Sequence, residues 1–558
     1  MQTKGWKHIM GNGRYSSGFY FAVLVVLAAL SYMIYGPVAA HPGWDYYFHL
    51  TRFDALVTAL TEGTFPLYID HSAALGYGYL SRVFYSDMLM VPFALIGMVT
   101  GAPVAFEIMV FTMTILCGII MYGAVKTIYK NPYIAFVSGL LYTFSVYRLF
   151  DVYSRAAFGE VLAFTFLPLV FWGLYHIIKG DCRKWYIIAF GFTLTIFSHV
   201  ISSVLTFFTV IILLAVYYKP LAKEPKRILF LVVAALTTIA ITSSYTLPLA
   251  EQLASNDFRY QYNDWSLPSR TKLSPEYMLW ALLCGFAYPK DIIIVGIGIL
   301  STAVVFLRIF VREKSEALRS VDTGLIVGVI FLVAVSSIFP WGRFPFTLFS
   351  FIQYPSRLFL FVTLFFSVAG AYYLSKIFLK EKQQLITAII LIACLIATFF
   401  CHNDYCRAVY TGHIKETNEK PLPGNFFYLN GAEYVPARVP SAYYISERRD
   451  SIKPLKGETE IYSPQRDKGA LAFEAKVQQP DSLELPLFYY KGYMAFANRK
   501  PVAISQSKNG LVQIPVEESG EVDVYYSGTP IQELSLLFNF VCLIILCIYI
   551  YRQKRRGC

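Results

Sequence analysis

The chain has 558 residues, of which 56% are hydrophobic and 17% aromatic, and its mean hydropathy is +0.50. These values exclude an ordinary soluble domain and indicate a polytopic α-helical membrane protein. The formal net charge of +12 does not indicate a nucleic-acid partner, because the Lys and Arg residues cluster in short segments between apolar runs, where they act as orientation signals.

Apolar runs of near-spanning length predict twelve transmembrane helices. They cover residues 19–35, 105–125, 133–147, 161–178, 186–197, 201–218, 228–249, 292–310, 324–339, 358–374, 385–400 and 534–551. A further run, 88–99, is too short to span and contains Pro92, so we expect it at the membrane interface. The first run has an apolar core longer than that of a typical signal peptide, so we interpret it as an anchor.

The distribution of basic residues predicts the direction of each helix. Every connecting segment that this alternation places inside carries more Lys and Arg than Asp and Glu. We therefore expect a multi-pass plasma-membrane protein with both termini in the cytoplasm. Residues 36–103, 148–160 and 250–291 then form outer loops.

Residues 402–533 are the one extended polar region, and the same alternation places them outside the cell. Apolar and polar residues alternate in 471–477, 485–490 and 522–526, which predicts strands and favours a small β-sandwich. We expect three parts: a transmembrane domain at 1–401, a β-rich extracytoplasmic domain at 402–533, and a last spanning helix with a basic cytoplasmic tail at 534–558.

The nine cysteines show no zinc or redox spacing, and most lie in or beside apolar runs. Cys401 and Cys406 lie close to His402 and His413. A disulfide, a metal site and ordinary core positions all remain open for this group, because its spacing matches no established ligand pattern.

The stretch 41–54 concentrates ionisable residues directly after the first apolar run. Asp45 follows Trp44 and precedes three aromatic residues, an environment that raises the basicity of a carboxylate, so we predict that Asp45 is a catalytic base. The alternative is a loop carboxylate that caps the following helix. His49 and Arg52 lie four and seven residues further on, on one helical face, which is equally typical of a solvated surface.

Further ionisable residues fall on the expected outer side. An ionised group at membrane depth costs about 2.5–3.5 kcal/mol, so such groups are usually paired, hydrated or functional. Arg155 and Arg357 match the fork geometry of a phosphate. Asp151 and Arg155 could instead form an ordinary intrahelical ion pair, and His199 could be a hydrogen-bonded residue at a helix end.

Together these residues suit an anionic, lipid-linked substrate. We expect Asp45 to deprotonate an acceptor hydroxyl that attacks the anomeric carbon of a sugar carried on a lipid phosphate, while arginines stabilise the departing phosphate. A single displacement inverts the anomeric centre. The predicted catalytic residues are Asp45, His49 and Glu160, and the predicted substrate-binding residues are Arg52, Arg82, Asp151, Arg155, His199 and Arg357. No cofactor is expected, and a divalent metal stays open but is not supported by the residues.

Several segments resemble a known family. The first is residues 43–52, which begins with Gly43-Trp44-Asp45. The other four are Tyr153-Ser154-Arg155-Ala156-Ala157-Phe158-Gly159-Glu160, Gln353-Tyr354-Pro355-Ser356-Arg357, Gly431-Ala432-Glu433-Tyr434-Val435-Pro436, and Leu485-Pro486-Leu487-Phe488-Tyr489-Tyr490 with Gly492-Tyr493. Their order resembles the GT-C superfamily of membrane glycosyltransferases. Within it the chain looks most like the YfhO-type bacterial proteins, including those often labelled 6-pyruvoyl-tetrahydropterin synthase-related.

This resemblance implies transfer of a sugar from an undecaprenyl-phosphate carrier to a cell-envelope glycopolymer, such as teichoic acid or a wall polysaccharide. Many GT-C members pair two acids in their first motif, whereas Asp45 is single here. Two other interpretations remain: a flippase or transporter of a lipid-linked sugar, and a noncatalytic envelope scaffold that binds polymer through residues 402–533. The crowding of ionisable residues on one side speaks against a transporter, whose site lies near the midplane.

Overall fold

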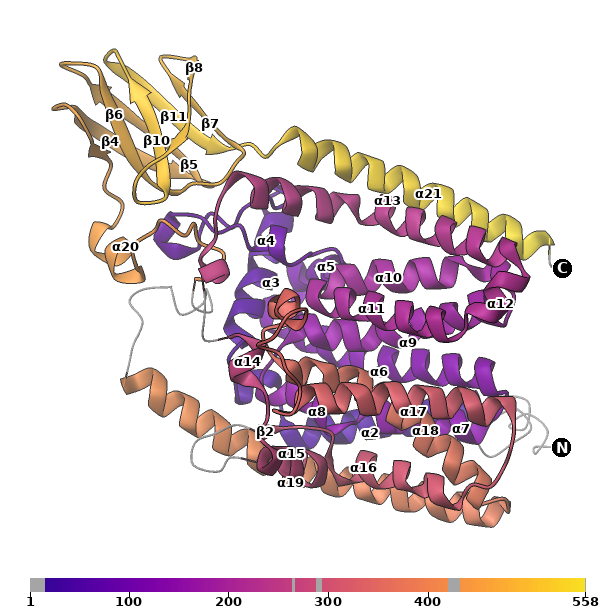
Figure 1. The fold of residues 1–558 in the computed structure, drawn as a ribbon. Helices are drawn as coiled ribbons and strands as arrows, with labels where there is room; N and C mark the ends of the chain where they lie inside the picture. The colour runs from indigo at the N-terminus through magenta and orange to yellow at the C-terminus, as the bar shows by residue number, and fades with distance from the viewer. Residues whose placement is uncertain (1–15, 263–265, 288–293, 420–431, 557–558) are drawn as a thin grey trace, which may run out of the picture. The chain divides into compact units, whose positions relative to one another are not determined.

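The computed structural model describes residues 16–262, 266–287, 294–419 and 432–556 (Figure 1). The chain divides into two compact units. The first comprises residues 1–46, 106–238 and 264–416, and the second comprises residues 47–105, 239–263 and 417–558. The start of the predicted span 292–310 and residue 431 of the fourth quoted motif lie outside the described residues.

Nine helices in the described part of the chain are long and apolar enough to cross a membrane, and each coincides with a predicted span. They are Ser17–Ala40, Ala102–Tyr129, Pro132–Ser154, Phe158–Ile178, Pro225–Ser255, Glu316–Val335, Pro355–Ile377, Glu381–Thr411 and Pro530–Gln553. The chain is therefore a polytopic helical membrane protein, as predicted.

The other three predicted spans form shorter helices. These are α10 (Tyr186–Ser198), α11 (Val200–Val216) and α16 (Gly298–Phe306), with 13, 17 and 9 residues. Thirteen residues rise only about 20 Å, less than the roughly 30 Å of a hydrocarbon core. The run 88–99 forms the 10-residue helix α5 (Val91–Thr100), too short to span, as expected.

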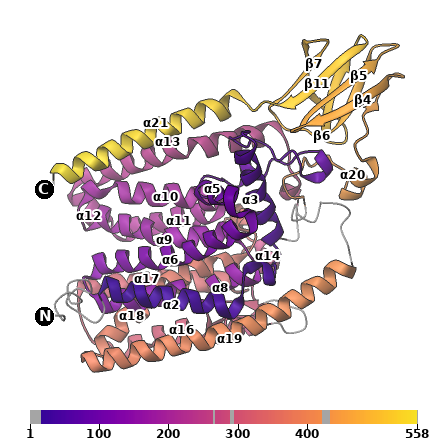
Figure 2. The same cartoon turned by 180° about the vertical axis from the view of Figure 1, so that it is seen from behind.

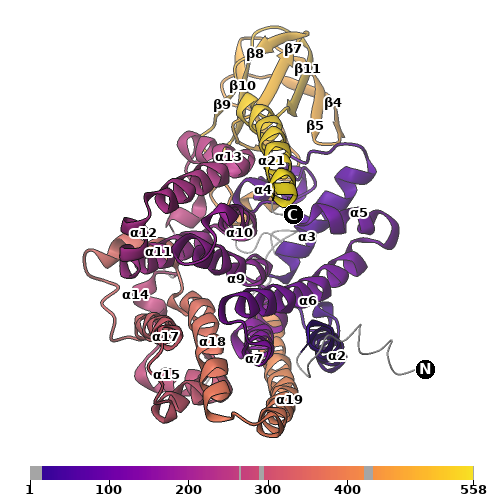
Figure 3. The same cartoon turned by 90° about the vertical axis from the view of Figure 1, so that its right-hand side faces the viewer.

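The centre of the first unit is a bundle of α7 (Pro132–Thr143), α9 (Phe158–Ile178), α17 (Glu316–Val335) and α18 (Phe359–Ile377), seen end-on in Figure 3. α18 packs against both α7 and α17, and α9 packs against α10. Every residue of α7 after the exposed Pro132 is buried, as is typical of a helix surrounded by others. Asn131 caps the N-terminus of α7, because its side chain accepts hydrogen bonds from the amides of Tyr133 and Ile134.

Ion pairs join the helix ends that we expected on one side of the membrane. Lys179, at the end of α9, pairs with Glu316 at 2.7 Å. Arg308 pairs with Asp322 at 2.8 Å, and Lys376 pairs with Glu313 at 2.9 Å. The relative directions of these helices therefore agree with the predicted alternation. Which end faces the cytoplasm stays a prediction.

The helix α19 (Glu381–Glu419) is longer than predicted. Its 39 residues rise about 58 Å, so the expected domain boundary at residue 402 falls inside a helix (Figures 1 and 2). Polar residues do not end a helix by themselves, and between Glu381, where α19 begins, and Pro421 the sequence has no proline.

Cys401 and Cys406 lie on α19 and are both free, so the disulfide considered from the sequence is wrong. Residues five apart on a helix are rotated by roughly 140°, and accordingly Cys401 is exposed while Cys406 is buried. The side chain of His413 lies outside the described residues.

The second unit contains the expected β-sandwich. One sheet has the strand order β3-β6-β10-β9 and the other β4-β5-β11-β7-β8, with antiparallel pairing throughout. The predicted strands correspond to β5 (Ala470–Lys476), β6 (Asp481–Phe488) and β11 (Gly520–Tyr526). The others are β3 (Lys453–Pro454), β4 (Glu460–Asp467), β7 (Tyr493–Ala497), β8 (Lys500–Val502), β9 (Ser505–Gln506) and β10 (Leu511–Val516).

Alternate residues of both sheets form one apolar core, which includes Phe473, Leu485, Ile514 and Val524. This is the packing that a period-two pattern predicts for two sheets face to face. At the rim of the sandwich, Arg448 at the end of α20 (Ala442–Arg448) is buried together with a carboxylate of β6.

That buried ion pair joins Arg448 to Glu484. The Arg448 Nη1 lies 2.6 Å from the Glu484 Oε1, and both side chains are at most 2% exposed. Arg448 Nη2 also donates to the Glu484 carbonyl at 2.8 Å, and Asn509 donates to the second carboxylate oxygen at 3.0 Å.

Replacing Glu484 by Ala leaves the buried Arg448 guanidinium without its ion-pair partner. We therefore expect the free energy of unfolding of the sandwich to fall by about 3–5 kcal/mol. Limited proteolysis of the full-length protein in detergent, followed by mass mapping of residues 432–526, measures this. The double variant Arg448→Met/Glu484→Leu removes both charges and is the control, expected close to wild type. A Glu484→Ala protein that resists protease as well as wild type contradicts the prediction.

Candidate active site

An irregular turn between α7 and α9 positions the polar residues of the site. It runs through α8 (Val146–Leu149) and the π-helical turn η3 (Phe150–Ser154). Ala156 has a left-handed backbone (φ 59°), and the Ala157 amide donates to the Asp151 carbonyl at 2.8 Å. Single π-turns are rare in proteins overall, and those that occur are frequently found at functional sites.

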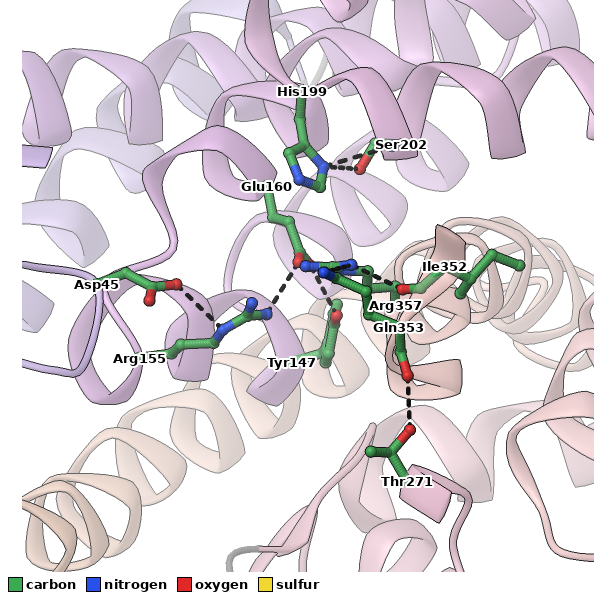
Figure 4. A network of polar contacts seen from close by, with 10 residues as sticks. All are labelled: Asp45, Tyr147, Arg155, Glu160, His199, Ser202, Thr271, Ile352, Gln353 and Arg357. Carbon is green, nitrogen blue, oxygen red and sulfur yellow. Dashed lines mark hydrogen bonds and ion pairs between the residues drawn. The ribbon is translucent and has the colours of Figure 1, made fainter. Parts of the chain in front are cut away.

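The carboxylate of Glu160 is the centre of the site (Figure 4). Its Oε1 lies 2.9 Å from Arg155 Nη1 and 2.8 Å from Arg357 Nε. Its Oε2 accepts a hydrogen bond from the Tyr147 hydroxyl at 3.0 Å. Glu160 is 2% exposed and lies in the first turn of α9, where the helix dipole favours negative charge. Two arginines thus share one buried carboxylate.

Backbone groups and an aromatic ring fix the second arginine. Arg357 Nη1 donates to the Ile352 carbonyl at 2.7 Å and to the Gln353 side-chain oxygen at 2.9 Å. Gln353 has a left-handed backbone (φ 63°), and its carbonyl accepts from Thr271 at 2.6 Å. The Tyr354 ring lies 5.4 Å from the Arg357 guanidinium carbon and 5.7 Å from that of Arg155, so one ring supports both cations.

Asp45 reaches the same cluster through Arg155. Its Oδ2 lies 3.3 Å from Arg155 Nε, and its amide donates to the Arg155 carbonyl at 3.0 Å. The side chains of Asp45 and Arg155 are 17% and 19% exposed, so the pair is partly accessible. Gly43 allows this close approach, because a Cβ there would lie 2.6 Å from the Arg155 carbonyl carbon.

Asp151 is buried beside this cluster but does not pair as the helical spacing suggested. Arg155 pairs with Asp45 and Glu160 instead, so the intrahelical Asp151–Arg155 ion pair, left open as an alternative from the sequence, does not form. Asp151 is 0% exposed, and within the described residues neither carboxylate oxygen has a hydrogen-bond partner. The π-turn changes the angular offset between positions 151 and 155 from that of an α-helix.

His199 caps α11 next to Glu160 (Figure 4). Its Nδ1 accepts from the Ser202 amide at 3.3 Å and lies 2.9 Å from the Ser202 hydroxyl. This is the helix-end geometry considered as the alternative from the sequence. Burial lowers the pKa of the His199 imidazole to about 3, so the ring is neutral at physiological pH.

The remaining predicted residues lie in the second unit, in a separate ion-paired group. Arg52 Nε lies 3.0 Å and Arg82 Nε 4.0 Å from the two oxygens of Asp87. The Arg52 guanidinium lies 5.2 Å from the Tyr85 ring, and the His49 ring packs edge-on against Tyr85 at 5.6 Å.

Sequence reasoning did not assign Tyr147, Gln353 and Tyr354 to the site. In a chain with 17% aromatic residues, no pattern distinguishes a tyrosine that supports an arginine from one that packs in the core. The carboxylates of Asp45 and Glu160 face guanidinium groups, and the described residues contain no cluster of three His, Cys, Asp or Glu side chains placed to hold a metal ion. These side chains do not fit a metal centre.

The fold and this cluster define a polytopic membrane protein with a buried ionic site at one end of its central bundle. Residues 46–414, about two thirds of the chain, match the family described as bacterial membrane protein YfhO, and the chain belongs to this family. An uncharacterised protein of Lactococcus lactis subsp. cremoris (strain MG1363) is 24% identical over 595 residues, covering 96% of this chain and 95% of that protein.

Among solved structures, the archaeal oligosaccharyltransferase AglB from Archaeoglobus fulgidus, in complex with an inhibitory peptide and a dolichol-phosphate, gives a TM-score of 0.37 at 12% identity over 74% of this chain. The match spans 59% of that protein's length. A similarity at this level carries no conclusion about chemistry.

The lowered pKa of His199 predicts a pH-dependent stability. Between pH 6.5 and about pH 3 the unfolded chain binds a proton at this position that the folded protein does not, so stability falls as the pH falls. We expect the free energy of unfolding to fall, through this residue alone, by up to about 1.4 kcal/mol for each pH unit in this range. The variant His199→Asn keeps a cap acceptor for the Ser202 amide but cannot titrate. Thermal unfolding in detergent at several pH values compares the two, and parallel profiles contradict the prediction.

Proposed function

We propose that the protein is a membrane glycosyltransferase that moves a sugar from a polyprenyl-phosphate donor to an extracytoplasmic glycopolymer acceptor by a single inverting displacement. The observation that carries this proposal is the arrangement of Asp45 beside two arginines that share Glu160. Membership of a bacterial membrane protein family and the resemblance of its motifs to GT-C enzymes support it.

Arg155 and Arg357 are proposed to hold the donor phosphate. Within the described residues, the ion pairs and hydrogen bonds given above use Nε and Nη1 of each guanidinium, and Nη2 of each is the donor proposed for the phosphate. Two guanidinium groups fixed on one aromatic ring are preorganised for a phosphate that gains charge as the sugar leaves. The hydrocarbon chain of the donor would lie among the membrane helices.

Asp45 is proposed as the base that accepts the proton of the acceptor hydroxyl. Its carboxylate is 17% exposed, so an acceptor can approach it, whereas Glu160 is buried with both oxygens occupied. We therefore assign Glu160 to positioning the arginines, and Asp151 and His199 to the wall of the same site. Arg52 and Arg82 together carry one charge more than Asp87 and stay candidates for an anionic part of a substrate, with His49 beside them.

Replacing Asp45 by Asn removes the base and keeps the shape of the side chain. We expect sugar transfer in proteoliposomes to fall by about 10²–10⁴-fold while binding of the polyprenyl-phosphate sugar is retained. Asp181→Asn, at an exposed helix cap, is the matched control and keeps full activity. A flippase keeps transport in the Asp45→Asn variant and transfers no sugar in either protein, and a scaffold shows neither activity. Either result rejects the proposal.

Tyr354 provides a test of the phosphate site. The variant Tyr354→Leu loses the ring beneath both guanidinium groups, so we expect KM for the donor to rise about 5- to 30-fold with a smaller change in kcat. Tyr354→Phe keeps the ring and should restore KM to near the wild-type value. Equal KM values for the Leu and Phe variants would show that the ring does not position the arginines for donor binding.

A further inference from the structure

The first unit contains an apolar cavity at the opposite end of its bundle from the ionic site. Its volume is about 150 Å³, and its lining comes from α6 (Ala102–Tyr129), α9, α11, α17 and α18. Phe171 and Leu174 line it, whereas Glu160 lies at the start of the same helix α9. Fourteen residues of α-helix separate positions 160 and 174 by about 21 Å, so the two features are distinct.

Most of the lining is hydrocarbon. Met121 and Val125 of α6, Leu213 of α11, and Phe365 and Val368 of α18 all contribute to it. A cavity of this size with apolar walls does not hold water stably. In a helical membrane protein the apolar molecules available to fill it are lipid chains.

A cation lies at one end of the cavity. Lys179 lines it and stands 5.4 Å from the Tyr217 ring, which also lines it, and the Tyr217 hydroxyl is 3.3 Å from that of Ser320. Lys179 pairs with Glu316, whose side chain is 79% exposed. An ion pair so open to solvent contributes little stability, so the ammonium can exchange this partner for an anionic headgroup.

We propose that this cavity binds part of one acyl chain of an anionic phospholipid, with the headgroup phosphate held by Lys179. Arg183 and Lys184 follow in the exposed turn η4 (Cys182–Lys184) and add positive charge near the same helix end. The charge at the mouth selects an anionic lipid over a zwitterionic one, and the apolar walls accept the chain. The site is independent of the sugar-transfer chemistry proposed above.

Native mass spectrometry of the full-length protein, exchanged into mixed phosphatidylglycerol and phosphatidylcholine nanodiscs and then released, tests this proposal. We expect one retained phosphatidylglycerol per chain. Val368→Phe fills the cavity and should lower that occupancy by at least about tenfold. Lys179→Gln keeps the cavity and should lower the preference for phosphatidylglycerol over phosphatidylcholine about fivefold.

Matched variants separate the site from general effects. Val329→Phe makes the same substitution at a position of α17 that is 43% exposed, and Lys219→Gln removes an exposed charge that does not line the cavity. Both should retain the lipid as wild type does. Absence of a retained lipid in wild type, unchanged occupancy in a Val368→Phe protein that stays monodisperse, or retention of polyprenyl phosphate in place of phospholipid would each overturn the proposal.

Discussion

The ion pairs that the buried Glu160 carboxylate makes with two arginines are the constraint on which the site depends. Charges removed from water are stable only when each is paired and hydrogen-bonded, and Glu160 satisfies this with Arg155, Arg357 and Tyr147 together. Through these contacts, one side chain on α9 fixes the turn before it and the segment that precedes α18. Arg155 in turn positions Asp45, because the Arg155 carbonyl accepts a hydrogen bond from the Asp45 amide and the Arg155 Nε pairs with the Asp45 carboxylate. Three stretches far apart in the sequence are thereby brought to one place by a single negative charge.

Much of the fold could be predicted from the sequence because the membrane imposes a simple rule on helix length. Each of the nine long helices found in the described residues matches a predicted apolar run, and the alternating segments of 471–526 are strands of a sandwich. Composition could not separate α10 and α16 from spanning helices, because a short helix packed onto a membrane bundle is as apolar as a long one. Nor could it predict that α19 extends to Glu419, since a helix that leaves the bilayer continues until a breaker stops it.

The site was predictable in its residue types but not in its pairings. Position on the expected outer side, together with the cost of charge in a membrane, was enough to single out Asp45, Arg155, Glu160 and Arg357. Which carboxylate meets which guanidinium depends on the local backbone. The spacing of Asp151 and Arg155 is that of an α-helical ion pair, and only the π-turn reveals that this spacing does not apply.

The resting arrangement also bears on how a phosphate could bind. Glu160 offers one oxygen to both arginines, whereas a phosphate offers several, so a phosphate can accept hydrogen bonds from Nη2 of each arginine without displacing the carboxylate. Any movement of the Arg155 guanidinium towards that phosphate lengthens its contact with Asp45, which at 3.3 Å is already the longest ion pair of the cluster. In the proposed reaction, donor binding would therefore weaken the ion pair between Arg155 and Asp45, so that the Asp45 carboxylate can accept the proton of the acceptor hydroxyl. A shared carboxylate that keeps the arginines in place when the site is empty is what makes this exchange possible.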